Sequence, residues 1–203
     1  MNEYLDLLDY RRTVAGIYAE VRASGPGPAT WNRWRAHRDH LFANHPQTPI
    51  EDPATYEPLA YFEYHPSWRV EAAFKPIDAS DVSVAHSSTG STSFTKIGAL
   101  HFELDGHDGA LSVLWLNAYG GGIFVPFRDA TNGTETYGGG RYILDTVKGA
   151  DLGSTPSGLI LDFNYAYHPS CVHSPRWSCP LAPPENRLDF RIEAGERLRT
   201  DNS

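Results

Sequence analysis

The sequence is poor in cysteine and has no long apolar run. Of its 203 residues only two are cysteines, and 25 acidic against 17 basic side chains give a formal net charge of −8. Proteins that bind the nucleic-acid backbone usually carry a basic patch, so we expect no nucleic-acid partner. No apolar stretch approaches the ~20 residues of a membrane-spanning helix, and the first residues lack a signal-peptide pattern. We therefore expect a cytoplasmic protein without membrane contact, whose two cysteines do not form a structural disulfide.

The sequence does contain enough apolar material for a core, with 40% apolar and 12% aromatic residues. Residues 3–23 and 30–44 repeat apolar side chains every three or four positions, which predicts two helices. The Ser-Gly-Pro-Gly-Pro stretch at 24–28 separates them. The chain is accordingly divided into a helical hairpin packed on a barrel (1–46), an antiparallel β domain (47–195) and a flexible tail (196–203).

From about residue 59 the apolar period changes to two, as in half-buried strands. The alternation is clearest at 100–104, 159–164 and 188–193, and shorter runs bring the total to seven to nine strands. Because no helical stretch lies between these strands, the sequence favours an antiparallel sheet over a parallel one with helical crossovers. The sequence predicts a mainly β (α+β) fold, either an antiparallel β-barrel or a strongly curved sheet, preceded by the helical hairpin.

The densest group of functional side chains lies at residues 124–145. A tight hairpin needs about two turn residues, whereas this connection has roughly ten polar or glycine positions. Arg128 and Arg141 are candidates for binding a carboxylate or phosphate, since a guanidinium makes two-pronged contacts. The candidate catalytic acids and bases are Asp129, Glu135 and Tyr137. The alternative interpretation is a salt-bridged, glycine-kinked hairpin at the rim of a barrel.

A second group of candidates lies at 161–169, which reads Leu-Asp-Phe-Asn-Tyr-Ala-Tyr-His-Pro. Strand alternation places Asp162 and Asn164 on one face, where they could point inward to a ligand. We count Tyr165 with them as a candidate ligand-binding residue. Half-buried strands usually turn polar side chains to water, so ordinary solvent-facing residues remain the alternative.

The third group combines histidine and cysteine within twelve residues. Its members are His168, Cys171, His173 and Cys179. Such ligands can close a tetrahedral zinc site, but the paired Cys-x-x-Cys motif of zinc knuckles is absent. A redox-sensitive thiol pair and two buried packing thiols are the alternatives. We therefore predict no metal and no cofactor, and keep the zinc site as a weak alternative.

Three blocks of the sequence resemble one known family. They are Arg38-Asp39 to Pro66, Phe127-Arg128-Asp129-Ala-Thr-Asn-Gly to Gly-Gly-Gly-Arg141-Tyr142, and Asp162-Phe163-Asn164 to Pro-Pro-Glu185-Asn186. They resemble the prokaryotic domain-of-unknown-function family DUF1684, over nearly the whole chain. The resemblance implies no activity. In the family pattern tyrosine often stands at position 173 and asparagine at 168, which implies that a zinc site is not a family trait.

These observations leave two functional hypotheses, and neither decides whether the protein is an enzyme. The first is a polar small-molecule site in the mouth of a β-barrel, where arginines hold an anionic group and acid–base chemistry is available. The alternative is a non-catalytic interaction module that uses the tryptophan-bearing turns at 31–34. We expect a monomer or a homodimer.

Overall fold

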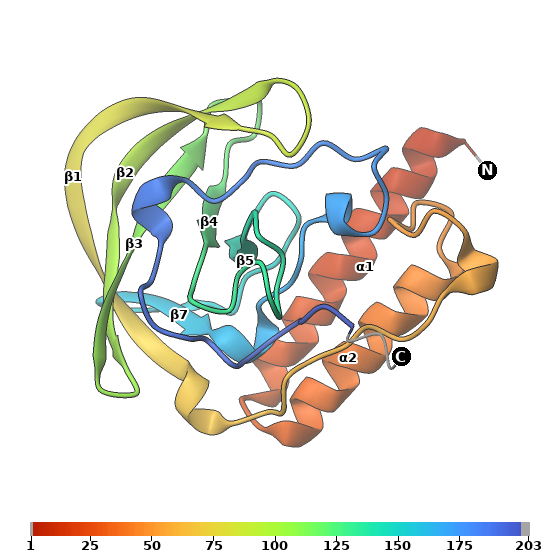
Figure 1. The fold of residues 1–203 in the computed structure, drawn as a ribbon, viewed down its shortest axis with the longest axis horizontal. Coiled ribbons are helices and arrows are strands. Elements are labelled where there is room, and N and C mark those ends of the chain that lie inside the picture. Colours follow the sequence, from red (N-terminus) through yellow and green to blue (C-terminus); the bar gives the residue numbers. More distant parts are fainter. Residues whose placement is uncertain (1, 200–203) are drawn as a thin grey trace.

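The computed structural model describes residues 2–199 and consists of two helices followed by one seven-stranded antiparallel sheet (Figure 1). The helices are α1 (Glu3–Ser24) and α2 (Pro28–Asn44). The strands are β1 (Arg69–Ala85), β2 (Ser91–Leu104), β3 (His107–Leu116), β4 (Ile123–Phe127), β5 (Arg141–Asp145), β6 (Ser154–Thr155) and β7 (Gly158–Asp162). Their order is β5-β4-β3-β2-β1-β7-β6, and the outermost strands do not pair within the described residues. The predicted mainly β fold is confirmed, and the sheet is strongly curved rather than closed into a barrel.

The helical hairpin forms for local reasons. The side chain of Asn2 accepts a hydrogen bond from the backbone N–H of Tyr4 at 2.9 Å and caps α1. Gly25, at φ 73°, ends α1, and Pro28 opens α2, where its missing N–H costs nothing. Within residues 2–199, no helix combines the length and apolar character needed to cross a bilayer.

Three register shifts help to curve the sheet. They lie between Pro76 and Ser80 of β1, between Lys96 and Gly98 of β2, and between Val125 and Pro126 of β4. An extra residue on one strand bends it and increases its twist. At Gly98 a Cβ atom would lie 2.5 Å from the ring of Phe74, so a larger residue does not fit this bend. Curvature gives the sheet a hollow face that other segments fill.

One hydrophobic core packs against the sheet. It contains residues from the strands and from segment 188–194. We predicted a strand at 188–193, but the described residues form none there. Leu188, Phe190 and Ile192 are buried in alternation, while the segment bonds to the chain after β4 instead of extending a sheet edge, as in the 3.0 Å bond from the N–H of Ala130 to the carbonyl of Phe190. Periodicity shows which side chains are buried and not which partner the backbone finds.

A second core joins the helices to the other end of the sheet. Trp31 and Trp34 are only 5% and 1% exposed, and Trp34 packs edge-on against Tyr165 with ring centroids 5.0 Å apart. The tryptophan-bearing face is therefore part of the fold, and the hypothesis of a docking face at 31–34 is wrong.

The chain after Gly195 is held in place as far as the description extends. The backbone N–H groups of Glu196, Arg197 and Leu198 donate to the carbonyls of Ala166, Ala60 and Glu135, at 2.8, 2.9 and 2.7 Å. A flexible tail beginning at 196 is therefore incorrect for residues 196–199. Residues 200–203, the rest of the predicted tail, lie outside the described part of the chain.

Candidate functional site

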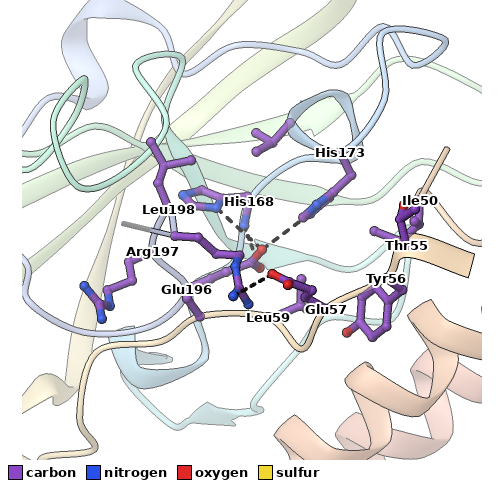
Figure 2. Close-up of a pocket in the computed structure, with 13 residues that line it drawn as sticks. Ile50, Thr55, Tyr56, Glu57, Leu59, His168, His173, Glu196, Arg197 and Leu198 are labelled. Atoms are coloured by element: carbon purple, nitrogen blue, oxygen red, sulfur yellow. Dashed lines mark hydrogen bonds and ion pairs between the residues drawn. The ribbon is translucent and has the colours of Figure 1, made fainter. Parts of the chain in front are cut away.

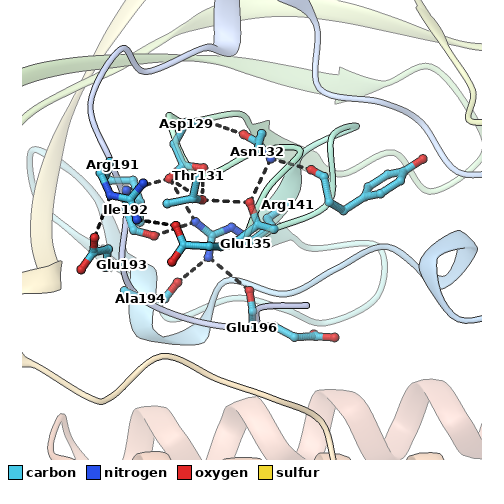
Figure 3. Close-up of polar contacts among 12 residues, drawn as sticks. Asp129, Thr131, Asn132, Glu135, Arg141, Arg191, Ile192, Glu193, Ala194 and Glu196 are labelled. Carbon is cyan, nitrogen blue, oxygen red and sulfur yellow. Dashed lines mark hydrogen bonds and ion pairs between the residues drawn. The ribbon is translucent and has the colours of Figure 1, made fainter. Parts of the chain in front are cut away.

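Arg141, a predicted ligand-binding residue, is fully buried and bound by the protein itself (Figure 3). Its Nη2 lies 3.4 Å from Oδ2 of Asp129 and donates to the carbonyl of Ile192 at 2.9 Å. Nη1 donates to the carbonyls of Ala194 and Glu196. Burial lowers the pKa of Arg141, and the charge of Asp129 opposes this effect. Arg141 therefore fastens the C-terminal segment to β5, and its expected role in ligand binding is corrected.

Asp129, a predicted catalytic residue, has no free side to offer a substrate. The carboxylate is 1% exposed and accepts hydrogen bonds from the hydroxyl of Thr131 at 2.9 Å and from the N–H of Ile192 at 2.6 Å. With Arg141 it forms a buried charge pair in which both carboxylate oxygens accept hydrogen bonds, while Nε of Arg141 has no hydrogen-bond partner among the described residues. The polar contacts of Asp129 therefore stabilise the fold.

Among the other candidates of segment 124–145, Glu135 lies near this pair, and its charge opposes the lowering of the pKa of Arg141 (Figure 3). Glu135 forms a surface ion pair with Arg191. Tyr137 is half-buried, and its hydroxyl lies 4.0 Å from Sγ of Cys171. The N–H of Arg128 donates to the carbonyl of Asn186 at 2.8 Å, which ties the backbone of this arginine to the proline-rich loop. Neither of the two clefts described below is lined by these residues.

The candidates at 162–165 also hold the fold together. The side-chain amide of Asn164 donates to Oδ1 of Asp162 at 2.8 Å and to the carbonyl of His65 at 2.9 Å. Burial raises the pKa of Asp162 to about 6, although its hydrogen bonds with Asn164 lower it. Asp162 and Tyr165 line a cavity of about 60 Å³, which is small for a ligand. Of the two orientations left open by the sequence, the structure has Asp162 and Asn164 buried, where these side chains mainly bind protein.

The four candidate zinc ligands separate into two pairs. His168 and His173 face Glu196, whereas Cys171 and Cys179 face each other. Within residues 2–199, no group of three or more histidine, cysteine or acidic side chains has the geometry to hold a metal ion. Both thiols are free.

Glu196 is the centre of a charged cluster that the sequence did not indicate (Figure 2). We call Arg38, His168, His173 and Glu196 the Glu196 cluster. Oε2 of Glu196 lies 2.7 Å from Nη2 of Arg38, and Oε1 lies 3.5 Å from Nδ1 of His168 and 3.4 Å from Nε2 of His173. Glu196 is 1% exposed, so the cluster places a carboxylate in the interior with a cation and two imidazoles around it.

The electrostatics of the cluster fix the charge states. Burial alone would raise the pKa of Glu196, but Arg38 and hydrogen bonds from both histidines hold it well below its usual value. Burial lowers the pKa of His168, which favours a neutral ring. Nε2 of His168 accepts from the backbone N–H of Tyr137 at 3.2 Å, so the ring proton lies on Nδ1, facing Glu196. His168 therefore presents a protonated Nδ1 to Glu196, whereas His173 faces Glu196 through Nε2.

Two clefts of about 330 Å³ each lie beside the Glu196 cluster. The first cleft is lined by apolar side chains and by ionisable groups of both signs. Its ionisable lining residues are Glu57, His168, His173, Glu196, Arg197 and Arg199. Arg199 is already paired with Glu57 at 2.6 Å. This cleft exposes the His173 side of the cluster.

The second cleft lies between α1, α2 and segment 167–180 and has largely apolar and aromatic walls. Tyr10, Tyr18, Phe42, Tyr167 and Trp177 form most of these walls. Three basic side chains line it, Arg11, Arg38 and Lys148, and none of the described lining residues is acidic. The chain as a whole has a net charge of −8, so a cleft whose charged lining residues are all basic among those described differs from the average of the chain.

The signal that could have located this region was weak. Arg38 and His168 are within sequence blocks quoted above, but Glu196 was assigned to a polar tail. The 158 positions between Arg38 and Glu196 leave no local pattern to connect them.

Comparison with known proteins agrees with the fold and supplies no activity. The solution NMR structure of an uncharacterised protein from gene locus rrnAC0354 of Haloarcula marismortui is similar, with 33% identity and a TM-score of 0.61. The match covers 86% of this chain and 95% of the Haloarcula chain. No curated protein sequence matches the chain. The family model for "Protein of unknown function (DUF1684)" matches residues 54–197. The resemblance seen in the sequence is confirmed, and the chain belongs to the DUF1684 family.

Proposed function

We propose that the second cleft binds a small amphipathic anion, such as a carboxylate with an aromatic or aliphatic body. The observation that carries this proposal is the combination of apolar walls with three basic and no acidic lining residues among those described. Ligand sites are typically apolar clefts of about 300–1,000 Å³ with a few polar groups that fix orientation. The sequence hypothesis of an arginine-held anion is thus retained, with other arginines.

The three basic residues have different parts in this site. Arg38 is paired with Glu196 and donates to the hydroxyl of Tyr61 at 3.1 Å. Its guanidinium is therefore an immobilised part of the cleft wall. Lys148 lies 3.5 Å from Asp145 and is partly neutralised. Arg11 is exposed and forms no ion pair with a described residue. Arg11 is therefore the residue that would contact the anionic group.

The test uses Arg11 and its neighbour Arg12 as a matched pair. Both are exposed on α1, but only Arg11 lines the cleft. Octanoate, benzoate and indole-3-acetate serve as probes in thermal-shift and calorimetric titrations. Arg11→Gln should weaken binding by about tenfold, the loss of one charged contact, and Arg12→Gln should leave it unchanged. Val14→Trp should block binding by filling the cleft.

Two results would reject this proposal. One is the absence of saturable binding for all three probes with the unmodified chain. The other is an equal loss of affinity in Arg11→Gln and Arg12→Gln, since this would indicate unspecific attraction to the helix surface.

The His173–Glu196 pair favours a second candidate function, acid–base catalysis in the first cleft. A carboxylate that holds one imidazole nitrogen leaves the other free to exchange a proton with a substrate. His37 and Glu20 form a matched exposed pair, also 3.4 Å apart. With p-nitrophenyl esters and phosphates as probes, His173→Gln should abolish hydrolysis and His37→Gln should not. An absence of hydrolysis above the buffer rate would exclude this function for these substrate classes.

The cytoplasmic location and the monomeric or homodimeric state stay predictions from the sequence. Gel filtration of the full chain checks the second of them.

A further inference from the structure

The side chains of Cys171 and Cys179 are hydrogen-bond partners although seven residues separate them in sequence. Cys171 belongs to the short 3-10 helix Ser170–Val172 and is half-buried, while Cys179 is 6% exposed. Cys179 is fixed by a two-way contact with Ser87. Its N–H donates to Oγ of Ser87 at 3.1 Å, and its carbonyl accepts from the N–H of Ser87 at 2.9 Å. Cys171 is therefore the more accessible of the two thiols, and Cys179 is buried.

The surroundings of the two thiols are unequal. The side chains of Cys179, Ser87 and Tyr137 are hydrogen-bond partners of the Cys171 sulfur, and the thiol of Cys171 faces the hydroxyl oxygen of Tyr137 at 4.0 Å. The Cys179 contact, followed by those of Ser87 and Tyr137, outweighs burial and lowers the pKa of Cys171 to about 6. The same contact, together with burial, raises the pKa of Cys179. The two shifts have opposite directions and favour the thiolate at Cys171 and the protonated thiol at Cys179.

We propose that Cys171 and Cys179 form a reactive dithiol that exchanges with a low-molecular-weight disulfide, with Cys171 as the nucleophile and Cys179 as the resolving thiol. This arrangement combines what such exchange needs, namely an accessible thiolate with hydrogen-bond donors around it and a second thiol in reach. A purely structural thiol pair would need no such difference between its members.

The exchange balances in two steps. The Cys171 thiolate attacks one sulfur of the incoming disulfide, its S–S bond breaks, and one thiolate leaves and takes a proton from water. Cys179 then gives its proton to solvent and attacks Sγ of Cys171, which releases the second thiol. In sum the protein dithiol is oxidised by two electrons to a disulfide, and the incoming disulfide is reduced to two thiols.

The main experiment incubates the reduced full chain with glutathione disulfide at pH 7, followed by acid quenching and mass spectrometry. The unmodified chain should lose both thiols and release two glutathione molecules. Cys179→Ser should retain one glutathione on Cys171, and Cys171→Ser should react about tenfold more slowly. The proposal is overturned if the unmodified chain keeps both thiols, if it stops at one bound glutathione, or if the two serine variants react equally.

A second measurement needs no cysteine variant. Peptide mapping after limited iodoacetamide treatment should find Cys171 alkylated before Cys179, with a rate that levels off above about pH 6. Tyr137→Phe removes a hydrogen-bond donor and should shift this profile to higher pH. Tyr119→Phe, at a fully exposed position, is the control. Equal alkylation of both cysteines, or an unchanged profile in Tyr137→Phe, contradicts the proposal.

Discussion

Arg141 and Asp129 face each other across 3.4 Å with neither side chain exposed to solvent. The pair joins β5 to the start of the long connection after β4, and Arg141 also binds the carbonyls of the C-terminal segment. The polar residues that mark this stretch of sequence therefore act as an internal fastening.

Replacement of Arg141 tests this interpretation. Arg141→Met should lower the free energy of unfolding by about 3–5 kcal/mol, because Asp129 would remain buried without its partner. Arg187→Met, at an exposed position, should change it by less than about 0.5 kcal/mol. Urea denaturation measures both. A variant that keeps its stability would return Arg141 to the list of ligand-binding candidates.

Glu196 should stabilise the protein at neutral pH and lose this effect in acid. The pKa of Glu196 is held well below its usual value of 4.5, so its contribution is complete above that pH and disappears as the pH falls through the lower folded value. Glu196→Gln should lower the free energy of unfolding by about 3–5 kcal/mol at pH 7, because it leaves Arg38 without its charged partner. The difference from the unmodified chain should narrow towards pH 3. Glu193→Gln, on the surface, is the control, and a constant difference across the pH range would contradict the cluster's charge assignment.

Asp162 should have the opposite pH dependence. Its pKa is raised from 3.8 to about 6, so the folded chain binds the Asp162 proton more tightly than the unfolded chain does. This difference stabilises the folded state below pH 4, and the stabilisation is lost as the pH rises through 6. Asp162→Asn should therefore match the unmodified chain at pH 4 and exceed its stability by about 3 kcal/mol at pH 8. Denaturation of both chains across this range checks the sign. Lower stability of the variant at pH 8 would show that the carboxylate itself is needed.

Two glycines give a matched test of packing. A Cβ at Gly158 would lie 1.9 Å from the carbonyl oxygen of Ala72 in β1, whereas one at Gly16 in α1 meets nothing within 4 Å. Gly158→Ala should destabilise the chain by about 3 kcal/mol through overpacking. Gly16→Ala should stabilise it by up to about 1 kcal/mol through helix propensity. Thermal unfolding measures the stability of both variants. Equal effects would contradict the close approach of β7 to β1 at Gly158.

The elements that the sequence predicted are those with local causes. The helical hairpin follows from apolar spacing and two prolines, and β2 and β3 follow from alternation around Asp105-Gly106, whose φ values of 51° and 76° suit a tight turn. The open edges of the sheet could not be predicted, because barrel closure depends on how strongly the bulges bend strands that are far apart in sequence.

The candidate site was harder to predict than the fold. Polar density at 124–145 identified residues that bind one another, since a buried charge pair needs the same side chains as an anion site. The basic second cleft combines Arg11, Arg38 and Lys148 from three separate segments. Glu196 was missed because its neighbours in sequence are polar while its partners in space are distant.

The contact between Arg38 and Glu196 also bears on the order in which the molecule is completed during synthesis. Translation produces Arg38 158 positions before its carboxylate partner, whereas the helices around it can form early from local contacts. Until residue 196 is synthesised, the guanidinium of Arg38 can pack against aromatic rings but has no counter-ion. Removing water from around it at that stage would bury an uncompensated charge. A nascent chain should therefore keep this face of α2 hydrated, and the last step of folding should be the arrival of Glu196.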